Sequence, residues 1–361
     1  MSNPLDTNDL RVRVQAAVDA AISSQSRVLS EIGDELTPLV TAVGSLLQGG
    51  KRLRAAFFYW GYRAAGGQDN EAVIRAATAM EFFQAAALMH DDVMDDSDTR
   101  RGMPAAHRRL ADQHAAAGWA GSGDRFGQAG AILGGDLCLT WSDELFATSG
   151  LPGAELTRAR PMFDQMRTQL MGGQFLDVLE AARGWDGLTT DERIARARRV
   201  IRYKSAKYSI EHPLLIGAAA AGVSTSDRDA LSRYGLDLGE AFQLRDDVLG
   251  VFGDPAQTGK PAGDDLREGK LTVLVALALD HAGPQVVTLF EKLLGMPDLD
   301  EPGVDELRAA IIASGALDRV EQMILDLSAS AREGLRSTTA LTEEGRAALD
   351  ALIDVSTARS A

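Results

Sequence analysis

The amino-acid sequence predicts an all-α protein. Alanine and leucine are abundant and β-branched runs are scarce; apolar residues make up 45% of the chain and aromatic residues only 6%. This composition favours packed helices over sheet. The 361 residues exceed an average domain, but one large helical core can hold a chain of this length. We therefore expect a single domain over residues 1–361, with residues 1–10 loosely ordered.

Apolar stretches alternate with chain breakers, and this alternation sets the expected order of the helices. Glycine pairs and Pro38 interrupt the N-terminal stretches. Thr189 and Glu192 have the spacing of a capping box, and Ser226 opens the following helix in a similar way. Loops are expected at residues 97–108 and 118–130. The expected helices cover residues 11–47 (with a break at Pro38), 55–62, 71–96, 130–148, 154–182, 189–207, 226–252, 271–282 and 300–361.

Charge and cysteine content exclude several classes of protein. The formal net charge of −15 argues against a nucleic-acid partner, because phosphate backbones need a basic surface. The single cysteine, Cys138, excludes an internal disulfide and a zinc cluster, and it fits a reducing compartment. The first thirty residues lack the apolar core of a signal peptide, and the longest apolar run, residues 214–223, is far short of a membrane span. We expect a cytoplasmic protein without a transmembrane segment.

Two carboxylates end the long apolar helix expected over residues 71–96. Asp91 and Asp95 are four residues apart, so they share one helix face and repel each other unless a cation lies between them. Magnesium suits this pair, because it often takes one or two carboxylates together with substrate phosphates. Arg100 and Arg101 follow, and arginine forks match phosphate oxygens. The stretch is interpreted as a metal–phosphate clamp; the alternative is a solvated acidic helix end.

A second acidic pair, Asp246 and Asp247, strengthens this interpretation. Both pairs follow an aromatic-containing apolar run, and a glutamine precedes each by at most two turns, Gln84 in one case and Gln243 in the other. Acidic pairs at the ends of two apolar helices are difficult to explain as devices for solubility.

Basic clusters stand out in this acidic chain. Gly49 and Gly50 precede Lys51 and Arg54 at the start of a helix, where backbone N–H groups and cations can bind a phosphate together. The alternative is a helix end followed by surface cations. Further cations lie at Lys204, Lys207, Lys260 and Lys270.

The combined motifs resemble the trans-isoprenyl diphosphate synthase (polyprenyl synthetase) family. Six matching segments occur in the family's order over about residues 45–275. They are Gly49–Arg54, Asp91–Asp95 with Arg100–Gly102, Gly173–Gln174 with Asp177, Lys204–Ser205, Phe242–Asp247, and Gly259–Lys270.

The resemblance implies a single large helical bundle of the isoprenoid synthase type around a deep central cavity, usually in a homodimer. It implies that an allylic diphosphate loses pyrophosphate and that its carbocation alkylates isopentenyl diphosphate. Three Mg²⁺ ions are expected with diphosphate bound. By resemblance, the residues that bind metal are Asp91, Asp95 and Asp246, supported by Asp92 and Asp247; those that bind isopentenyl diphosphate are Lys51, Arg54, Gln84 and Arg101; those that act on the allylic diphosphate are Arg100, Lys204, Ser205, Gln243, Lys260 and Lys270.

Three positions depart from the family pattern. Gly250 stands where many members have the third aspartate of the second motif, Ser205 where threonine is common, and Gln84 where many bacterial members have histidine. Two carboxylates and water are expected to suffice at the second motif. The rival functions are a class I terpene cyclase, which needs no isopentenyl diphosphate site, and a non-catalytic subunit of a heteromeric synthase, which could lose its aspartates. A third alternative is an acidic helical scaffold without catalytic chemistry.

Product length is predicted from the helix that leads to Asp91. Ala86 and Ala87 are small, so the growing chain can pass the first turn. Phe83 and Met80 lie further back, at about 12 and 16 Å by the rise of a helix, and are the candidates for the floor. The alternative is that both are ordinary core residues. This floor favours a twenty-carbon product, geranylgeranyl diphosphate, over farnesyl or longer diphosphates.

Overall fold

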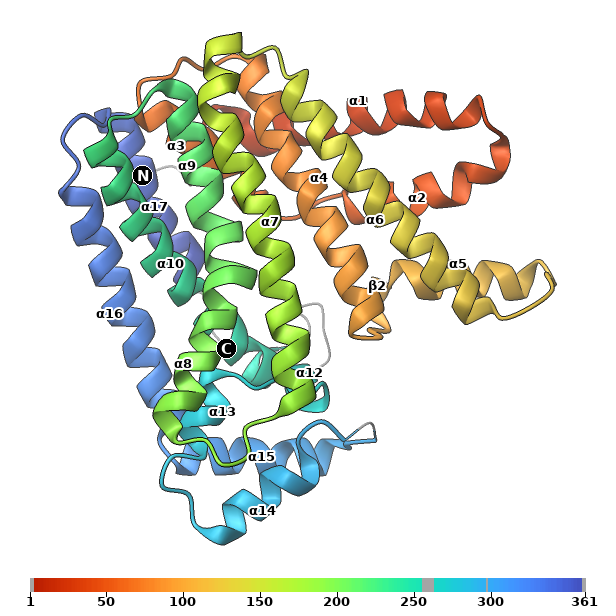
Figure 1. Cartoon of the computed structure of the whole chain (residues 1–361), viewed down its shortest axis with the longest axis vertical. Helices are drawn as coiled ribbons and strands as arrows, with labels where there is room; N and C mark the ends of the chain where they lie inside the picture. The colour runs from red at the N-terminus through yellow and green to blue at the C-terminus, as the bar shows by residue number, and fades with distance from the viewer. Residues whose placement is uncertain (1–2, 255–262, 297, 359–361) are drawn as a thin grey trace. The chain divides into compact units, whose positions relative to one another are not determined.

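The computed structural model describes residues 3–254, 263–296 and 298–358, and their regular secondary structure is almost entirely helical (Figure 1). The all-α prediction is confirmed. By contacts within the chain the helices form two compact units, described separately below. The first contains residues 1–159 and 217–222, and the second contains residues 160–216 and 223–361.

The first unit is organised around α4, which packs along α6. Asn70 caps α4 by accepting a hydrogen bond from the backbone N–H of Val73 at 3.0 Å. Cys138 and Trp141 of α6 pack against Phe82 and Met89 of α4 in one apolar cluster. The elements of this unit are α1 (Leu10–Ser30), α2 (Thr37–Leu46), α3 (Leu53–Ala64), α4 (Glu71–Met94), β1 (Thr99–Arg100), β2 (Met103–Pro104), α5 (Ala106–Ala116) and α6 (Gly123–Ala147).

Helix α4 is long and apolar enough, by length and composition, to cross a membrane, and it is the single such helix among the described residues. However, 72% of its most apolar window is buried inside the protein. That burial is the behaviour of a core helix in a packed protein.

Three expectations for the first unit are wrong. Residues 3–10 are not loose, because Leu5 is buried and the indole N–H of Trp60 donates to the Pro4 carbonyl at 2.9 Å. Helix α6 begins at Gly123, inside the expected glycine-rich connection, because Ser122 caps it. The expected loop 97–108 contains the two-stranded hairpin β1–β2 and the start of α5.

The second unit contains α10, the C-terminal helices and most of α7; residues 153–159 of α7 and 217–221 of α9 belong to the first unit. The capping box is confirmed: the Thr189 hydroxyl accepts from Glu192 N–H and the Glu192 carboxylate accepts from Thr189 N–H. The helix that begins at Thr190 does not end at residue 207, as expected. It continues as a π-helix from residue 201 to residue 211 and then as α9. Ser224, not Ser226, caps α10. The elements are α7 (Gly153–Arg183), α8 (Thr190–Val200), the π-helix (Ile201–Glu211), α9 (His212–Ala221), α10 (Thr225–Phe252), α12 (Asp264–Arg267), α13 (Val273–Ala278), α14 (Pro284–Leu293), α15 (Glu301–Ala313), α16 (Ala316–Arg336) and α17 (Glu343–Thr357).

Buried polar contacts join the C-terminal helices to α10. The Tyr234 hydroxyl donates to the Leu349 carbonyl at 2.7 Å. The Asp227 carboxylate accepts from the backbone N–H groups of Thr339 and Ala340 at 2.7 and 3.1 Å. These bonds hold α17 and the turn before it against α10, the helix that carries the second acidic pair.

Candidate active site

The first acidic motif lies at the C-terminal end of α4. Asp91 and Asp95 are partly exposed, whereas Asp92 is only 2% exposed. Arg100, from β1, donates through Nε to Asp92 Oδ1 at 2.8 Å and through Nη2 to the same oxygen, and Nη2 lies 3.7 Å from Asp91. Burial raises the pKa of Asp92, and the charge of Arg100 opposes that shift. Asp92 therefore orients Arg100 beside Asp91, one of the two partly exposed carboxylates.

The glycine pair before α3 brings a second arginine close. Gly49 and Gly50 have φ values of 67° and 87°, in the left-handed region that favours glycine. A Cβ at Gly50 would lie 3.5 Å from the guanidinium nitrogens of Arg101. Arg101 Nη1 donates to the Leu46 carbonyl at 2.9 Å, which fixes the arginine over the turn.

The cations predicted to hold isopentenyl diphosphate gather at this turn. Loss of solvent lowers the pKa of Arg101, the positive charges of Arg52 and Arg54 add to the shift, and Glu81 opposes it. The first unit therefore brings Arg101 together with the residues around Lys51 and Arg54. One expectation needs correction: the backbone N–H groups of α3 are not all available to a phosphate, because the N–H of Ala55 donates to Glu81 at 3.1 Å.

In the second unit Lys204 stands on the π-helix. Its ammonium donates to Asp177 Oδ2 of α7 at 2.5 Å. Gly173 permits this pairing, because a Cβ there would lie 2.4 Å from the backbone of Tyr203. Ser205 is the next residue on the π-helix and is partly buried. The motif at Gly173–Gln174 and the motif at Lys204–Ser205 thus belong to one structural arrangement. The close backbone approach at Gly173 brings α7 and the π-helix together.

The second acidic pair differs from the first in its burial. Asp247 is 6% exposed and accepts from Gln243 Nε2 at 2.8 Å, whereas Asp246 is partly exposed. Burial raises the pKa of Asp247 to about 8; Asp265 adds to the shift and the bond from Gln243 opposes it. Gln243 therefore holds Asp247, and Asp246 is the more accessible carboxylate.

Lys270 is held by acidic residues of its own segment. Its ammonium lies 3.0 Å from Asp265 and 2.6 Å from Glu268. Burial alone would lower the pKa of Lys270, but these two carboxylates raise it well above the usual value. The other cation predicted in this region, Lys260, lies outside the described residues.

Comparison with known proteins identifies the family of this chain. The polyprenyl synthetase family matches residues 37–311. The chain belongs to the polyprenyl synthetase family. Its members are prenyl diphosphate synthases, so the chain is a trans-prenyltransferase, as the motifs predicted.

Relatives of different product length are similar to this polyprenyl synthetase. The crystal structure of a geranylgeranyl pyrophosphate synthase from Corynebacterium glutamicum, complexed with isoprenyl diphosphate and magnesium, has 41% sequence identity and a TM-score of 0.90 over 96% of this chain and 98% of that chain. The geranylfarnesyl diphosphate synthase of Aeropyrum pernix is 33% identical over 85% of this chain and 89% of its own length. The nonaprenyl diphosphate synthase of Mycobacterium tuberculosis is 30% identical over 96% and 91%.

The donor set of this polyprenyl synthetase fits magnesium. Among the described residues there is no group of three or more histidine, cysteine, aspartate or glutamate side chains that could hold a metal alone. Magnesium does not need one, since it commonly binds one or two carboxylates, waters and substrate phosphates. Asp91 with Asp95, and Asp246 in the second unit, are carboxylates of this kind.

The predicted chain-length residues all lie on α4. Met80 and Phe83 are each 1% exposed, and Ala87 is partly exposed. Ala86 is fully buried in the apolar cluster with Phe82, so it faces packed core. Gln84, predicted for isopentenyl diphosphate, is partly exposed on the same helix.

Three charged side chains that support the predicted ones were given no role from the sequence: Arg52 and Asp265, which lie within the matching segments, and Glu81. Arg52 and Glu81 form a buried ion pair with an N–O distance of 3.1 Å. Glu81 carried a signal that could have been used, because a charged residue inside a long apolar helix needs a partner. Asp265 carried no such signal, since it lies in a short stretch of mostly charged residues.

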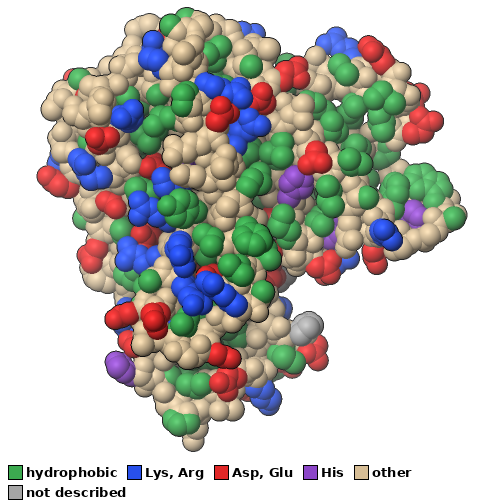
Figure 2. All heavy atoms as spheres, in the orientation of Figure 1, with side chains coloured by type: hydrophobic (Ala, Val, Ile, Leu, Met, Phe, Trp, Pro, Cys, Tyr) green, Lys and Arg blue, Asp and Glu red, His purple; other side chains and the backbone are tan. Residues whose placement is uncertain are grey.

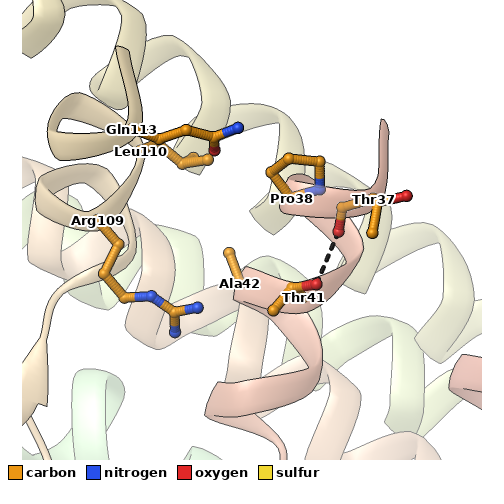
Figure 3. Close-up of a pocket in the computed structure, with 7 residues that line it drawn as sticks. All are labelled: Thr37, Pro38, Thr41, Ala42, Arg109, Leu110 and Gln113. Atoms are coloured by element: carbon orange, nitrogen blue, oxygen red, sulfur yellow. Dashed lines mark hydrogen bonds between the residues drawn. The ribbon is translucent and has the colours of Figure 1, made fainter. Parts of the chain in front are cut away.

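A separate cavity of about 230 Å³ lies between α2 and α5 (Figure 3). Thr37, Pro38 and Ala42 face Arg109 and Gln113 across it, and Thr41 Oγ1 donates to the Thr37 carbonyl at 2.8 Å. None of the predicted site residues lines this cavity. We assign it no role in the reaction.

Proposed function

We propose that this polyprenyl synthetase condenses isopentenyl diphosphate with an allylic diphosphate in a magnesium-dependent reaction and that its product is geranylgeranyl diphosphate. The observation that carries the chain length is the run Ala87, Phe83 and Met80 on α4, behind Asp91. Ala87 is small, while Phe83 and Met80 are large and almost fully buried. The likeness to a geranylgeranyl pyrophosphate synthase at 41% identity supports the same product.

In the proposed reaction the C–O bond of the allylic diphosphate breaks and pyrophosphate leaves. The allylic carbon then bonds to the terminal carbon of the isopentenyl double bond, and a proton is lost. Bound magnesium neutralises the charge that grows on the leaving group. No protein nucleophile is needed, and we assign the final proton to the released pyrophosphate.

Positions in the structure support several of the proposed roles. Lys51, Arg54 and Arg101, grouped at the turn before α3, hold isopentenyl diphosphate, and Gln84 of α4 is assigned to the same substrate from the family pattern. Arg100, Lys204 and Gln243 act on the allylic diphosphate, and Asp92, Asp177 and Asp247 respectively keep them in place. We extend the allylic role to Ser205, Lys260 and Lys270 from the family pattern.

The test is chromatography of dephosphorylated products after incubation with isopentenyl diphosphate, each allylic diphosphate in turn, and Mg²⁺. A twenty-carbon alcohol as the main product is expected. A twenty-five-carbon product would instead align the chain with the geranylfarnesyl diphosphate synthase among its relatives, and a fifteen-carbon product would make it a farnesyl diphosphate synthase. A cyclic hydrocarbon would indicate a terpene cyclase, and absence of any product would indicate a non-catalytic subunit.

We further propose that the chain forms a homodimer. Large apolar side chains remain exposed on α6 within the first unit: Phe126, Ile132 and Leu133 are 40%, 45% and 57% exposed. Apolar side chains also reach the surface among interspersed charges on the face drawn in Figure 2. Light scattering of the wild type and of Leu133→Glu tests the proposal, which requires a dimer that the variant weakens. A cytoplasmic location, tested by cell fractionation, is proposed from the single buried cysteine.

A further inference from the structure

Arg52 lies between Lys51 and Arg54 in the sequence, and its environment is unusual for an arginine. It is only 4% exposed, and it adopts the left-handed conformation with φ of 55°. Non-glycine residues avoid this conformation unless their surroundings enforce it. Its guanidinium donates through Nη1 to Glu81 Oε2 at 3.1 Å, and through Nη2 to Gln15 Oε1 at 2.5 Å and to the Leu47 carbonyl.

Glu81 connects the turn before α3 to the helix that carries the metal-binding motif. The residue is 6% exposed and lies on α4, ten positions before Asp91. One carboxylate oxygen accepts from Arg52, and the other accepts from the backbone N–H of Ala55 in the first turn of α3, at 3.1 Å. Glu81 thus caps α3 from another helix and neutralises the arginine that precedes it.

Gln15 of α1 completes the arrangement. Its Oε1 accepts from Arg52 Nη2 and also from the backbone N–H of Gly49 at 3.3 Å. The guanidinium of Arg52 therefore bonds to three separate parts of the first unit: α1, the end of α2 and α4. These bonds hold the turn in a backbone conformation with positive φ at Gly49, Gly50 and Arg52.

We propose that Glu81 is a positioning residue for diphosphate binding, acting through Arg52 to fix the turn that presents Lys51, Arg54 and Arg101. The inference rests on the proposed function, since it concerns the same isopentenyl diphosphate site. Its physical reason is charge. Arg52, Arg54 and Arg101 are like charges held close together. Burial is the main cause of the lowered pKa of Arg101, the charges of Arg52 and Arg54 add to the shift, and the Glu81 carboxylate opposes it.

Removal of the Glu81 charge separates this role from a merely structural one. In Glu81→Gln the side chain keeps its size and can still accept from Ala55, but Arg52 loses its ion pair inside the protein. The turn before α3 should then relax, and Lys51, Arg54 and Arg101 should lose the arrangement that binds the diphosphate. We expect the KM for isopentenyl diphosphate to rise about tenfold or more, with kcat and the KM for the allylic diphosphate changing less than about twofold.

Gln15→Ala supplies an independent variant that does not threaten the fold, because Gln15 is a partly exposed residue of α1. It removes two hydrogen bonds to the same turn and should raise the same KM by a smaller factor, about threefold. The matched control is Gln25→Ala. Gln25 is also on α1 and donates to Glu144 at 2.8 Å, but it does not contact the turn, so its KM values should equal those of the wild type.

Calorimetric titration with inorganic pyrophosphate in metal-free buffer gives a readout that does not require turnover. The variant Lys51→Ala identifies the pyrophosphate binding that belongs to this site, because it should abolish that binding. The affinity of the site for pyrophosphate should fall about tenfold in Glu81→Gln and stay unchanged in Gln25→Ala. If the wild type released no pyrophosphate from its substrates, the proposed function would fail, yet this titration would still decide the role of Glu81.

Two results would overturn the inference. One is a lower melting temperature of Glu81→Gln with both KM values and pyrophosphate affinity unchanged, which would make the ion pair purely structural. The other is an equal rise of KM for both substrates. If Glu81→Gln did not fold, wild-type values for Gln15→Ala would overturn the inference in the same way.

Discussion

The carboxylate of Asp265 occupies the space that a side chain at Gly250 would need. A Cβ at position 250 would lie 1.9 Å from Asp265 Oδ2. Asp265 is 9% exposed, and its other oxygen accepts from Lys270 at 3.0 Å, so it has little freedom to move away. Gly250 is four residues after Asp246 on α10, where many family members have an aspartate. The carboxylate in that region therefore comes from α12, a different part of the chain.

Substitution of Gly250 should consequently cost stability. Gly250→Ala is expected to lower the free energy of unfolding by about 1–3 kcal/mol through overpacking, and Gly250→Asp by more, because two carboxylates would then compete for one space. Thermal denaturation measures both. The matched control is Gly153→Ala, because a Cβ at Gly153 meets nothing within 4 Å. Equal melting temperatures for Gly250→Ala and Gly153→Ala would contradict the crowding.

Loss of a metal-binding carboxylate should abolish most turnover. Asp91→Ala or Asp246→Ala is expected to lower kcat by about a hundredfold to a thousandfold, because each change weakens the stabilisation of the leaving pyrophosphate. A pyrophosphate-release assay measures the effect. Asp326→Ala, at an exposed aspartate of α16, is the control. Near-normal turnover in excess chelator would exclude the metal-assisted reaction.

The two diphosphate sites should respond separately to substitution. Lys51→Ala and Arg54→Ala are expected to raise KM mainly for isopentenyl diphosphate, since both residues belong to the turn over which Arg101 lies. Lys204→Ala and Lys260→Ala are expected to raise KM mainly for the allylic diphosphate. Steady-state kinetics with each substrate varied in turn provide the measurement. The division of the sites is wrong if all four variants weaken both substrates equally.

Product length should follow the size of the side chains on one face of α4. Ala87→Phe is expected to shorten the product by closing the path one turn behind Asp91, and Phe83→Ala to lengthen it by removing the floor. Chromatography of the dephosphorylated products measures both changes. Phe82→Ala is the matched control, because Phe82 packs in the apolar cluster against α6; it should cost stability without lengthening the product. No change in length from Ala87→Phe or Phe83→Ala would place the floor on other helices.

Acid should destabilise the second unit partly through His212. The ring is 2% exposed and its Nε2 lies 3.0 Å from Gln169 Oε1. Burial lowers the pKa of His212 from 6.5 to about 4, Glu211 opposes the shift, and Lys207 adds to it. The folded ring therefore stays neutral while the unfolded ring gains a proton, so the contribution to stability is complete above pH 6.5 and is lost as the pH falls from 6.5 towards 4.

His212→Gln should remove this dependence. Between about pH 7.5 and about pH 5 the wild type is expected to lose about 2 kcal/mol more free energy of unfolding than the variant, at about 1.4 kcal/mol for each unit of pKa. Urea denaturation at both pH values measures the difference. His281→Gln is the control, since the side chain of His281 is 95% exposed. Parallel losses in the wild type and His212→Gln would contradict the buried neutral ring.

The candidate site was predictable where the signal is local. The i, i+4 spacing of Asp91 and Asp95, the capping box at Thr189, and the order of the motifs can all be seen in the sequence. Helix boundaries were less predictable near glycine. The start of α6 at Gly123 was missed because its glycines favour a loop by intrinsic preference, whereas packing and the Ser122 cap support a helix.

By itself the sequence determined the fold class, the family, and the carboxylates and cations on which the reaction is proposed to depend. These follow from composition, helical periodicity and short motifs, which act between residues close in the chain. Only the tertiary structure decided that Arg101 lies over Gly50, that Glu81 neutralises Arg52, and that Asp265 fills the space beside Gly250. Each of these contacts joins residues that are distant in the sequence. Their energy comes from burial and charge pairing, which exist only once the chain has folded.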